Sequence, residues 1–329
     1  MSGSAESPPE LSIVIPMYNE GLAIQTTIGT VLDTIAGVVG SLEIVCVDDG
    51  SRDDTAARVR ELSLSDPRVR LVELSRNFGK EGALAAGLDH ARGRAVVIMD
   101  ADLQHPPSFV PEMVRLWRDG YEVVDAVKRQ RAQESVLYKW FTRAFNSMMA
   151  EASGAQFRGA SDFKLLDRRV VETLRHLPER ERFFRGLVAW LGFRTAVVEF
   201  DVAERVAGTT KWSIVQLTRY SIRNLLAFSS LPLKTIATLG LGALIFSVLF
   251  AAWALFRYLR GDALSGFTTV ILLQLILGGL LLTGMGTIAL YIGAMFRELK
   301  GRPSYVAVHR PPSSGAEPAP RSVGGAAPP

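Results

Sequence analysis

Four polar clusters in the sequence each follow a short apolar run that predicts a β-strand. They are Pro16-Met17-Tyr18-Asn19-Glu20, Asp48-Asp49-Gly50-Ser51, Arg76-Asn77-Phe78-Gly79-Lys80 and Asp100-Ala101-Asp102-Leu103-Gln104-His105. One such cluster alone is more readily explained by a surface turn, because Asp, Asn, Gly and Ser favour turns whatever their function. Four clusters at the ends of four predicted strands instead indicate a shared site.

The pair Asp100 and Asp102 has the most specific chemistry of these clusters. Two carboxylates at positions i and i+2 of a strand end can both reach one divalent cation or the groups around it. Oxygen ligands suit Mg²⁺ or Mn²⁺, and Mg²⁺ commonly binds through one or two carboxylates plus substrate phosphates. The sequence has no His and Cys spacing typical of a zinc site. The prediction is therefore a Mg²⁺ or Mn²⁺ site, with His105 interpreted as a turn residue.

Apolar runs and helical patterns alternate through the first hundred residues. The strand-like runs are 11–16, 43–47, 70–74 and 95–99, and the helical segments between them are 20–37, 55–64 and 82–91. Such alternation predicts an α/β fold with an open, mostly parallel sheet and helices on both faces. Ligands of these sheets bind beyond the carboxyl ends of the strands. The four polar clusters follow those ends.

Two apolar segments near the C-terminus predict a transmembrane hairpin. No charged residue occurs from Thr235 to Phe256 or from Ala263 to Phe296. A helix over the first stretch would be roughly 33 Å long, enough to cross a hydrocarbon core of about 30 Å. The second stretch is longer and could span with tilt. We expect spanning helices at about 235–257 and 266–293.

The charges that flank this hairpin predict its orientation. Basic residues before the first span and after the second are Lys211, Arg219, Arg223, Lys234, Arg297, Lys300, Arg302 and Arg310. The loop between the spans carries less positive charge, so both termini are expected on the cytoplasmic side. Residues 1–10 are polar and lack the pattern of a secretory leader. The sequence thus predicts an integral protein of the cytoplasmic (inner) membrane with its catalytic domain in the cytoplasm.

Composition narrows the possible partners. The net charge is +4, without a basic stripe interleaved with aromatic residues, which argues against a nucleic-acid partner. Basic residues around a membrane hairpin suit anionic lipid head groups better. The single cysteine, Cys46, excludes an internal disulfide and lies inside an apolar run. It is predicted to be a packed core thiol.

The chain divides into six predicted segments. These are a disordered N-terminus 1–10, a catalytic domain 11–210, an interfacial helix region 211–232, the transmembrane hairpin 233–299, a cytoplasmic juxtamembrane segment 300–310 and a disordered tail 311–329. The tail is rich in Pro, Gly, Ala and Ser. Residues 138–152 and 212–231 mix aromatic, apolar and basic positions at helical spacing. They are either interfacial helices lying on a bilayer or ordinary core-facing helices.

Taken together, the motifs resemble those of the polyprenyl-phosphate glycosyltransferases. This group belongs to glycosyltransferase family 2, has the GT-A fold, and includes dolichol-phosphate mannose synthases and bactoprenol glucosyltransferases. The motifs are PMYNE, VDDGS, RNFGKEGALAAGLDHARG, MDADLQHPP, SDFKLLDRR and AERVAGTTKWS, followed by two C-terminal spans. The resemblance covers about residues 11–308. It is strongest to the bactoprenol glucosyltransferase branch, through RNFGKE, SDFKLLDR and YIGAMFRELKGRPSY.

The resemblance implies a role for particular residues. The implied nucleotide-binding residues are Pro16, Tyr18, Glu20, Val47, Asp49, Asp100, Ala101, Lys128 and Arg129. The implied metal-side residues are Asp100, Asp102 and Gln104, and the implied catalytic residues are Asp102, Asp162, Arg205 and Lys211. An arginine of the family falls on Lys128 here, with Arg129 beside it. Because Lys and Arg are not equivalent donors, which of the two contacts phosphate stays open.

The implied chemistry has a physical basis. A departing nucleoside diphosphate gains negative charge, so a metal ion and the cations Arg205 and Lys211 would stabilise the transition state more than the ground state. A solvated basic loop is the alternative for these two residues. A lipid phosphate acceptor is already anionic and hardly needs a general base. We therefore expect Asp162 to orient substrate or the cations at 128–131, the alternative being a helix cap. Arg185 is either an acceptor-phosphate contact or a salt-bridged helix residue.

The predicted function is inverting transfer of one sugar to a polyprenyl phosphate of undecaprenyl, decaprenyl or dolichyl type. The branch resemblance favours UDP-glucose as donor, and a GDP-mannose-dependent mannose synthase is the alternative. A processive polysaccharide synthase would carry a Gln-x-x-Arg-Trp element and more spans, which this sequence lacks. A catalytically silent membrane scaffold should have lost the Asp pair or the basic residues, which are present. A homo-oligomer formed through the hairpin is expected.

Overall fold

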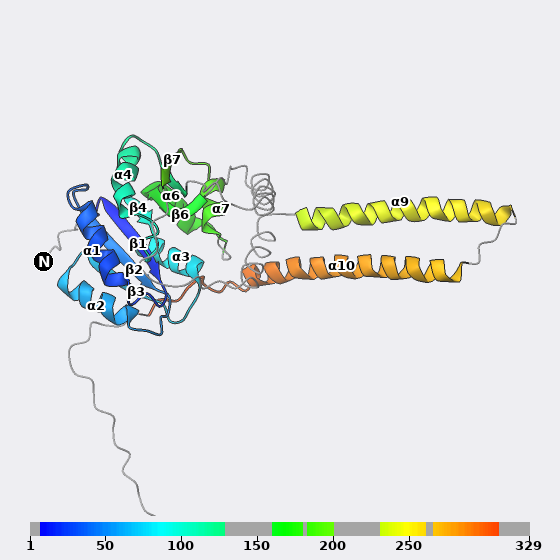
Figure 1. Ribbon diagram of the computed structural model, residues 1–329, viewed down its shortest axis with the longest axis horizontal. Coiled ribbons are helices and arrows are strands. Elements are labelled where there is room, and N and C mark those ends of the chain that lie inside the picture. The colour runs from blue at the N-terminus through cyan, green and yellow to red at the C-terminus, as the bar shows by residue number, and fades with distance from the viewer. Residues whose placement is uncertain (1–6, 129–159, 180–182, 201–230, 261–265, 309–329) are drawn as a thin grey trace, which may run out of the picture.

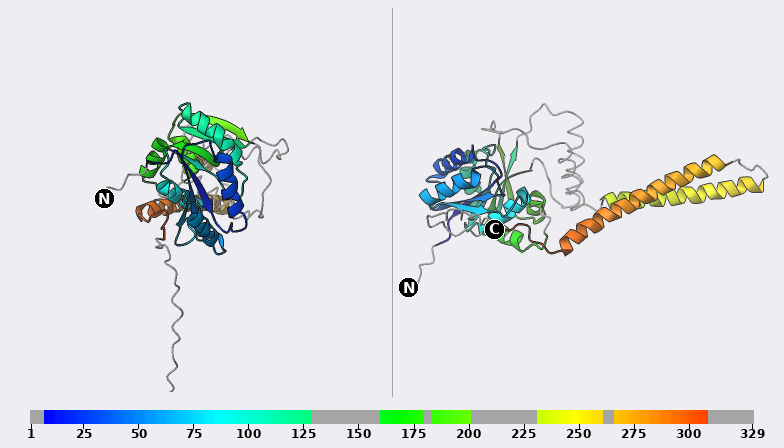
Figure 2. Two further views of the ribbon diagram at one scale, coloured as in Figure 1. Left: turned by 90° about the vertical axis from the view of Figure 1, so that its left-hand side faces the viewer. Right: turned by 90° about the horizontal axis from the view of Figure 1, so that it is seen from below.

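The computed structural model of the protein describes residues 7–128, 160–179, 183–200, 231–260 and 266–308. Within these residues, an α/β domain lies at one end and two long helices project from it (Figure 1, Figure 2). The segments expected to be disordered or interfacial fall largely outside the described residues, namely 1–6, 138–152, 212–230 and 311–329. The boundaries predicted at 210 and 232 therefore stay predictions.

The domain is built around a seven-stranded sheet in the order β3-β2-β1-β4-β6-β5-β7. Its strands are β1 Leu11–Met17, β2 Leu42–Asp48, β3 Val69–Glu73, β4 Ala95–Ile98, β5 Val123–Lys128, β6 Ala160–Asp167 and β7 Thr195–Phe200. Its helices are α1 Ile24–Ile35, α2 Thr55–Ser65, α3 Lys80–His90, α4 Val110–Arg118, α6 Arg168–His176 and α7 Phe184–Trp190, with a 3-10 turn at Pro107–Phe109. The predicted α/β fold with a mostly parallel sheet is confirmed.

Among the described strands, β6 runs antiparallel to both of its neighbours, β4 and β5. The other pairings are parallel, with β1 between β2 and β4. In the register of β4 and β6, Ile98 lies opposite Lys164. Asp100 follows the end of β4 and Asp162 lies near the start of β6, so both residues are at this end of the strand pair. The reversed strand therefore begins at the edge where the parallel strands end.

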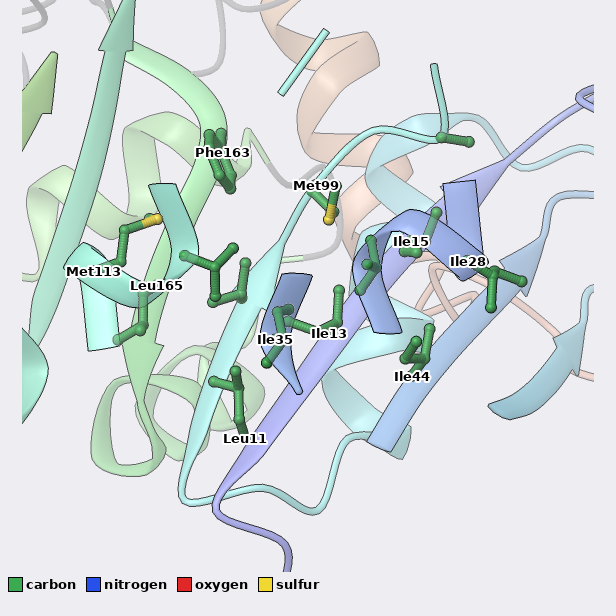
Figure 3. Packing of buried hydrophobic residues seen from close by; sticks show 14 of the residues in the cluster. Leu11, Ile13, Ile15, Ile28, Ile35, Ile44, Met99, Met113, Phe163 and Leu165 are labelled. Atoms are coloured by element: carbon green, nitrogen blue, oxygen red, sulfur yellow. The ribbon is translucent and has the colours of Figure 1, made fainter. Parts of the chain in front are cut away.

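Both faces of the sheet are covered, which explains why its strands are continuous apolar runs. One buried cluster joins the sheet to α1, α2 and α4, and the other joins it to α3, α6 and α7. Successive side chains of a strand point to opposite faces, so in β1 Ile13 and Ile15 belong to the first cluster and Val14 to the second. Figure 3 shows the first cluster. Cys46 is fully buried in it, as predicted.

The two C-terminal helices are α9 Leu231–Leu259 and α10 Phe267–Leu299. Each is long and apolar enough to cross a membrane, with mean hydropathy 2.1 over Thr235–Trp253 and 1.8 over Ile276–Leu299. Their apolar side chains are largely exposed, as at Leu249 (66%) and Leu282 (71%). The helices run side by side away from the domain (Figure 1). In water such a surface would be costly, because burying a large apolar side chain is worth about 1.5–3 kcal/mol.

The chain after α10 returns to the domain and adds to the free edge of β3. Ala307 forms an antiparallel bridge with Leu74. The Ser75 amide donates to the Val306 carbonyl (2.9 Å), and the Val308 amide donates to the Glu73 carbonyl (2.7 Å). We call residues 301–308 the C-terminal strap. It connects the membrane-type helix α10 directly to the strand that precedes the Arg76–Lys80 cluster.

Candidate active site

The carboxyl end of β4 carries the acidic pair singled out from the sequence. The chain turns directly after it, because Leu103 adopts a positive φ of 58°. The Asp102 Oδ1 atom accepts a hydrogen bond from the Gln104 amide (3.1 Å), and Thr27 Oγ1 of α1 donates to the Ala101 carbonyl (2.7 Å). These bonds fix the turn against the first helix. Both carboxylates are partly accessible, whereas Ala101 is buried.

His105 was interpreted as a turn residue, and in the structure it also holds Asp100 by a hydrogen bond from the core side. Its side chain is buried, and its Nδ1 accepts a hydrogen bond from the Asp100 amide (3.0 Å). The proton of the neutral ring then lies on Nε2, which is 3.8 Å from Asp100 Oδ2. The ring stacks on Phe163 of β6, with centroids 5.1 Å apart and planes inclined by 9°. The histidine thus fixes the position of Asp100 from the core.

One cation joins Asp100 to the antiparallel strand. Lys80 Nζ, at the start of α3, lies 2.6 Å from Asp100 Oδ1 and 2.7 Å from Asp162 Oδ2. Burial lowers the pKa of Lys80, but the two carboxylates outweigh that effect and raise it above its ordinary value. Burial raises the pKa of Asp100, but the charge of Lys80 and the hydrogen bond from its ammonium hold it below its ordinary value. The bridge therefore consists of one charged ammonium between two charged carboxylates.

Asp162 is also held by Arg185 of α7, in a two-pronged pair. Arg185 Nε and Nη2 donate to Asp162 Oδ1 (2.6 Å) and Oδ2 (2.8 Å). Burial raises the pKa of Asp162, but the Arg185 hydrogen bonds and the Lys80 charge outweigh it and hold the pKa well below its usual range. The helix-cap alternative for Asp162 is wrong, because the residue lies in β6 and the cap of α6 is Asp167. Arg185 is a salt-bridged helix residue.

The position of Lys80 is determined by the loop before it. Both Asp49 oxygens accept hydrogen bonds from that loop, from the Phe78 amide (2.7 Å) and the Gly79 amide (2.8 Å). Gly79 has a φ of +88°, a conformation that other residues rarely adopt. At Gly50, a side chain would meet the Arg76 carbonyl carbon at 2.6 Å. The Asp48–Ser51 and Arg76–Lys80 clusters are thus held together, and Lys80 lies next to Asp100.

Further charged groups surround this bridge. The Glu81 carboxylate accepts a hydrogen bond from the Phe184 amide (3.0 Å). Burial raises the pKa of Glu81 to about 7, and the nearby Asp162 charge adds to the effect. Lys164 lies two residues after Asp162 in β6, and its Nζ is 2.5 Å from Asp125 Oδ1. Burial lowers the pKa of Lys164 and raises that of Asp125, although each partner opposes the shift.

The predicted nucleotide-binding residues of the first two clusters lie at neighbouring strand ends. Pro16 pairs with Val47 across β1 and β2. The Glu20 amide donates to Thr55 Oγ1 (2.9 Å), so the chain after Tyr18 is tied to α2. Val47 is fully buried and packs in the second core cluster. These roles stay predictions.

The Asp48 carboxylate has a feature that could not be predicted from the sequence. The residue is buried, and its Oδ1 has no hydrogen-bond partner among the described residues. A buried polar atom without a partner is costly. Its place at the end of β2, beside Asp49, makes it a further candidate for contact with a ligand at this edge.

The acidic pair fits a divalent cation that takes its remaining ligands from a substrate. In the described part of the chain, no group of three or more His, Cys, Asp and Glu side chains is arranged to hold a metal by itself. Asp100 and Asp102 with Gln104 offer a small set of oxygen ligands at one turn. Such sparse sets suit Mg²⁺ or Mn²⁺ bound together with phosphate oxygens.

Several predicted basic residues cannot be placed relative to this edge. Arg129, Arg205 and Lys211 lie outside the described residues. Lys128 is the last residue of β5, opposite Phe200 of β7. Its backbone is therefore at the same end of the sheet as the C-terminus of β7. The proposed phosphate contacts of all four residues stay predictions.

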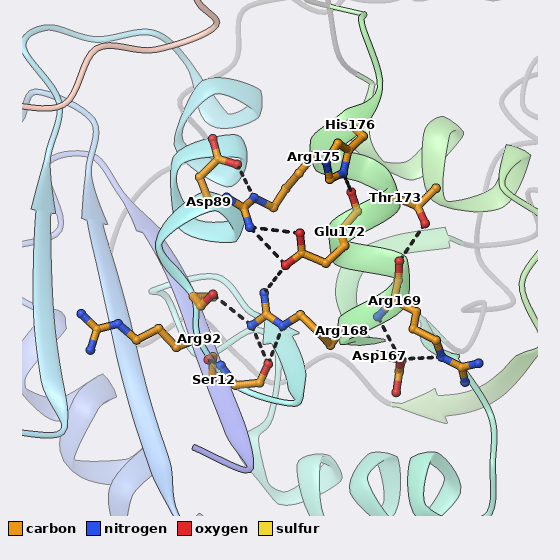
Figure 4. Close-up of polar contacts among 12 residues, drawn as sticks. Ser12, Asp89, Arg92, Asp167, Arg168, Arg169, Glu172, Thr173, Arg175 and His176 are labelled. Carbon is orange, nitrogen blue, oxygen red and sulfur yellow. Dashed lines mark hydrogen bonds and ion pairs between the residues drawn. The ribbon is translucent and has the colours of Figure 1, made fainter. Parts of the chain in front are cut away.

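A second charged cluster lies at the opposite end of the strands, before β4 begins and after β6 ends. A cavity of about 590 Å³ is lined there by Arg70, Asp89, His90, Arg92, Arg94, Arg168, Glu172 and Arg175. Figure 4 shows the polar contacts around Arg168 and Arg175. Arg168 donates to the Gly93 and Ala91 carbonyls, and Arg175 pairs with Asp89 and Glu172. These bonds tie α6 to α3 and to the start of β4, which is a structural role.

Sequence reasoning missed Lys80 as a site residue. Its signal was present, because a lysine in the first turn of a helix is opposed by the helix dipole and needs a specific partner. The predicted helix at 82–91 began two residues too late, whereas α3 begins at Lys80. Asp162 was expected to orient substrate or the cations at 128–131. Residues 129–131 lie outside the described residues, so this stays a prediction, and within the described residues Asp162 pairs with Lys80 and Arg185.

Comparisons with known proteins identify a family and several relatives. The family described as "Glycosyl transferase family 2" matches residues 12–175. An uncharacterized glycosyltransferase of Synechocystis is 39% identical over 90% of this chain and 94% of its own length. The bactoprenol glucosyl transferase of Shigella phage SfII is 36% identical over 90% of this chain and 97% of its own length. A prophage bactoprenol glucosyl transferase homolog of Escherichia coli is 34% identical, covering 90% and 98%.

Solved structures with a related fold are more distant. The mannosyltransferase PcManGT of Pyrobaculum calidifontis, in complex with GDP-Man and Mn²⁺, is 22% identical with a TM-score of 0.46. That match covers 85% of this chain and 88% of the other. Glucosyl-3-phosphoglycerate synthase of Mycobacterium tuberculosis is 23% identical with a TM-score of 0.45, covering 67% of this chain and 79% of the other.

Proposed function

This chain belongs to glycosyltransferase family 2, and we propose that it transfers one glucose from a nucleotide sugar to a polyprenyl phosphate. The acceptor is inferred from the relatives named bactoprenol glucosyl transferase, which match along nearly their whole length. The two exposed apolar helices support the same acceptor, because they would hold the domain beside a lipid surface. UDP-glucose is the donor that we propose.

The single observation that carries this proposal is the meeting of Asp100, Lys80 and Asp162 at one edge of the sheet. Lys80 Nζ lies 2.6 Å from Asp100 and 2.7 Å from Asp162. A sugar-nucleotide diphosphate needs cations near its oxygens, and an anionic acceptor needs cations on its own side. The bridge gives charged groups of both signs where the two substrates would meet.

Asp162 is suited to hold cations and poorly suited to remove a proton. Because its pKa is held well below the usual range by Arg185 and Lys80, its carboxylate is a weak base near neutral pH. A phosphate acceptor is already ionised and can attack the sugar C1 without a general base. The C1–O bond to the acceptor phosphate forms as the bond to the nucleoside diphosphate breaks. One displacement of this kind inverts the anomeric carbon.

Asp100, Asp102 and Gln104 would hold the divalent metal in this proposal. Bound there, Mg²⁺ or Mn²⁺ would neutralise charge on the departing diphosphate. The residues of the chain perform the remaining tasks. His105 fixes Asp100 through its amide (3.0 Å), and Arg185 fixes Asp162 through two hydrogen bonds. Arg205 and Lys211 are proposed to contact the diphosphate.

We also propose that the protein lies in the cytoplasmic membrane with its catalytic domain and both termini in the cytoplasm. The flanking basic residues support this orientation. The C-terminal strap supports the placement of the α10 end on the same side as the domain, since Ala307 pairs with Leu74. Self-association through the hairpin is proposed from the exposed apolar faces of both helices.

A donor screen tests the function. Membranes containing the full chain would be incubated with a short polyprenyl phosphate, Mg²⁺ or Mn²⁺ and each of UDP-glucose, other UDP-sugars and GDP-mannose, and the lipid product identified by mass. The expected product is polyprenyl phosphate carrying one hexose, formed from UDP-glucose. A product from GDP-mannose alone would indicate a mannose synthase. A polymer, or no transfer from any donor to the lipid, would contradict the proposal.

A further inference from the structure

Lys80 contacts two carboxylates that the proposed reaction uses for different purposes. Its Nζ lies 2.6 Å from Asp100, on the donor and metal side, and 2.7 Å from Asp162, near the start of the antiparallel strand β6. Asp162 has a second, independent partner in Arg185 (2.6 and 2.8 Å). Among the described residues, Asp100 pairs with the Lys80 ammonium, and its other neighbour is the neutral His105 ring at 3.8 Å. Loss of Lys80 would therefore affect Asp100 more than Asp162.

We propose that Lys80 is a resident counter-ion of Asp100 that competes with the divalent metal and is released to the diphosphate when metal and nucleotide bind together. This inference rests on the proposed function, because it assumes a metal and a nucleotide sugar at this edge. It adds a positioning role for a residue outside the acidic pair. Lys80 then makes metal binding conditional on the nucleotide.

The competition follows from the charges. An ammonium and a divalent cation that share the Asp100 carboxylate repel each other, so binding of the metal alone weakens the contact of Lys80 with Asp100. Without a nucleotide, Lys80 receives no replacement for that partner, and Asp162 is already shared with Arg185. A diphosphate brings new anionic oxygens within reach of the released ammonium. Metal and nucleotide should consequently bind cooperatively, and the coupling is reciprocal.

The placement of Lys80 allows such a release. It is the first residue of α3, its side chain is 39% exposed, and its stem is a flexible chain of four methylenes. The backbone before Lys80 is fixed, because the Asp49 carboxylate accepts a hydrogen bond from the Gly79 amide (2.8 Å). The helix dipole disfavours a cation at this end, so the lysine is retained by its carboxylate partners. The backbone is thus held while the ammonium remains free to change partners.

Mn²⁺ binding to the full chain in detergent tests this inference without a lipid acceptor. Free Mn²⁺ would be measured by electron paramagnetic resonance, with and without UDP or GDP, for the wild type and Lys80→Met. Without nucleotide, we expect Lys80→Met to bind Mn²⁺ about tenfold more tightly, equivalent to about 1.4 kcal/mol. The factor by which nucleotide tightens Mn²⁺ binding should fall by about the same tenfold.

Two matched variants separate competition from a general loss of positive charge. Arg115→Gln removes an exposed charge from α4, where Arg115 pairs with Glu112 and Asp119. It should change Mn²⁺ affinity by less than about threefold, because its charge is screened and touches neither carboxylate of the bridge. Lys80→Arg keeps the charge and should behave like the wild type. Lys80→Gln replaces Lys80→Met if the latter does not melt like the wild type.

The outcomes are distinguishable. Unchanged or weaker Mn²⁺ binding by a folded Lys80→Met or Lys80→Gln chain without nucleotide would overturn the competition. An equal change in Arg115→Gln would overturn the specific role of Lys80. A wild type whose Mn²⁺ affinity responds to neither UDP nor GDP would contradict the proposed nucleotide-sugar chemistry and the coupling. The comparison without nucleotide would still decide whether Lys80 competes for Asp100.

Discussion

Asp100 and Asp162 lie at the junction of β4 with the antiparallel β6, and they share one lysine. The register that pairs Ile98 with Lys164 brings them together, and Lys80 Nζ lies within 2.7 Å of an oxygen of each. Two carboxylates this close would repel each other without a cation between them. The reversed strand therefore creates both the need for Lys80 and the place where it binds.

Replacement of Asp102 by alanine should lower sugar-transfer turnover by about 10³-fold, equivalent to roughly 4 kcal/mol. The loss is expected because the acidic pair would then offer one carboxylate to the metal. Turnover of UDP-glucose with a short polyprenyl phosphate measures it. Asp119→Ala serves as control, since Asp119 is 53% exposed at the end of α4 and pairs with Arg115. Near-normal transfer by Asp102→Ala would remove the proposed role.

Arg185→Met should lower kcat by about one to two orders of magnitude, because each charge-assisted hydrogen bond to Asp162 is worth about 1.5–3 kcal/mol. Arg185→Lys should fall between it and the wild type, since lysine keeps the charge without the two-pronged geometry. Steady-state kinetics with both substrates checks this. An increase in KM for the lipid alone, with kcat unchanged, would instead indicate that Arg185 binds the acceptor phosphate directly.

Glu81→Gln should raise the melting temperature at alkaline pH. Burial raises the pKa of Glu81 from 4.5 to about 7. The folded chain therefore holds this proton more tightly than the unfolded chain, so its stabilising contribution is full below about pH 4.5 and is lost as the pH rises through about 7. Above about pH 7, the wild type carries a buried charge on Glu81 that the glutamine variant lacks. The glutamine carbonyl can still accept from the Phe184 amide.

Melting curves at two pH values check this sign. Near pH 8.5 we expect the variant to be more stable by about 2 kcal/mol, or about 4–8 °C for a domain of this size. Near pH 4.5 the difference should shrink to about 1 °C or less. A variant that is less stable than the wild type at both pH values would show that the carboxylate contributes favourably as an anion.

Tyr305→Phe should weaken the attachment of the C-terminal strap. The Tyr305 hydroxyl donates to Asp89 Oδ2 (2.8 Å), and Asp89 also accepts from Arg175 (3.1 Å). Loss of one such bond costs about 1 kcal/mol, or about 2–4 °C in melting temperature. Tyr121→Phe is the control, because the Tyr121 ring packs under Arg194 and its hydroxyl makes no hydrogen bond in the described part of the chain. Equal shifts in both variants would argue against a specific tie.

Cys46 should be unreactive in the native protein. Its side chain is fully buried in β2, and burial raises the pKa of its thiol to about 12. Because the thiolate is the reactive form, a maleimide should label the native chain negligibly and the denatured chain completely. Mass spectrometry before and after denaturation measures this. Rapid labelling under native conditions would show that β2 opens locally.

Much of the fold could be predicted from local sequence patterns. The runs 11–16, 43–47, 70–74 and 95–99 become four parallel strands, because a strand covered on both faces must be apolar throughout. The polar clusters then had to follow their carboxyl ends. The apolar stretches after Thr235 likewise indicated two long helices, since their length and lack of charge are properties of the chain itself.

The assembly of the site could not be predicted in this way. The direction of β6, the meeting of Asp162 with Asp100 and the bridge through Lys80 depend on contacts between segments far apart in the chain. The sequence around a lysine or an aspartate does not show whether its side chain is solvated or forms an ion pair. The sequence by itself determined which residues lie at the strand ends and where the chain is apolar. Only the tertiary structure decided which charges face one another, because electrostatic pairing depends on distance in space and not on distance along the chain.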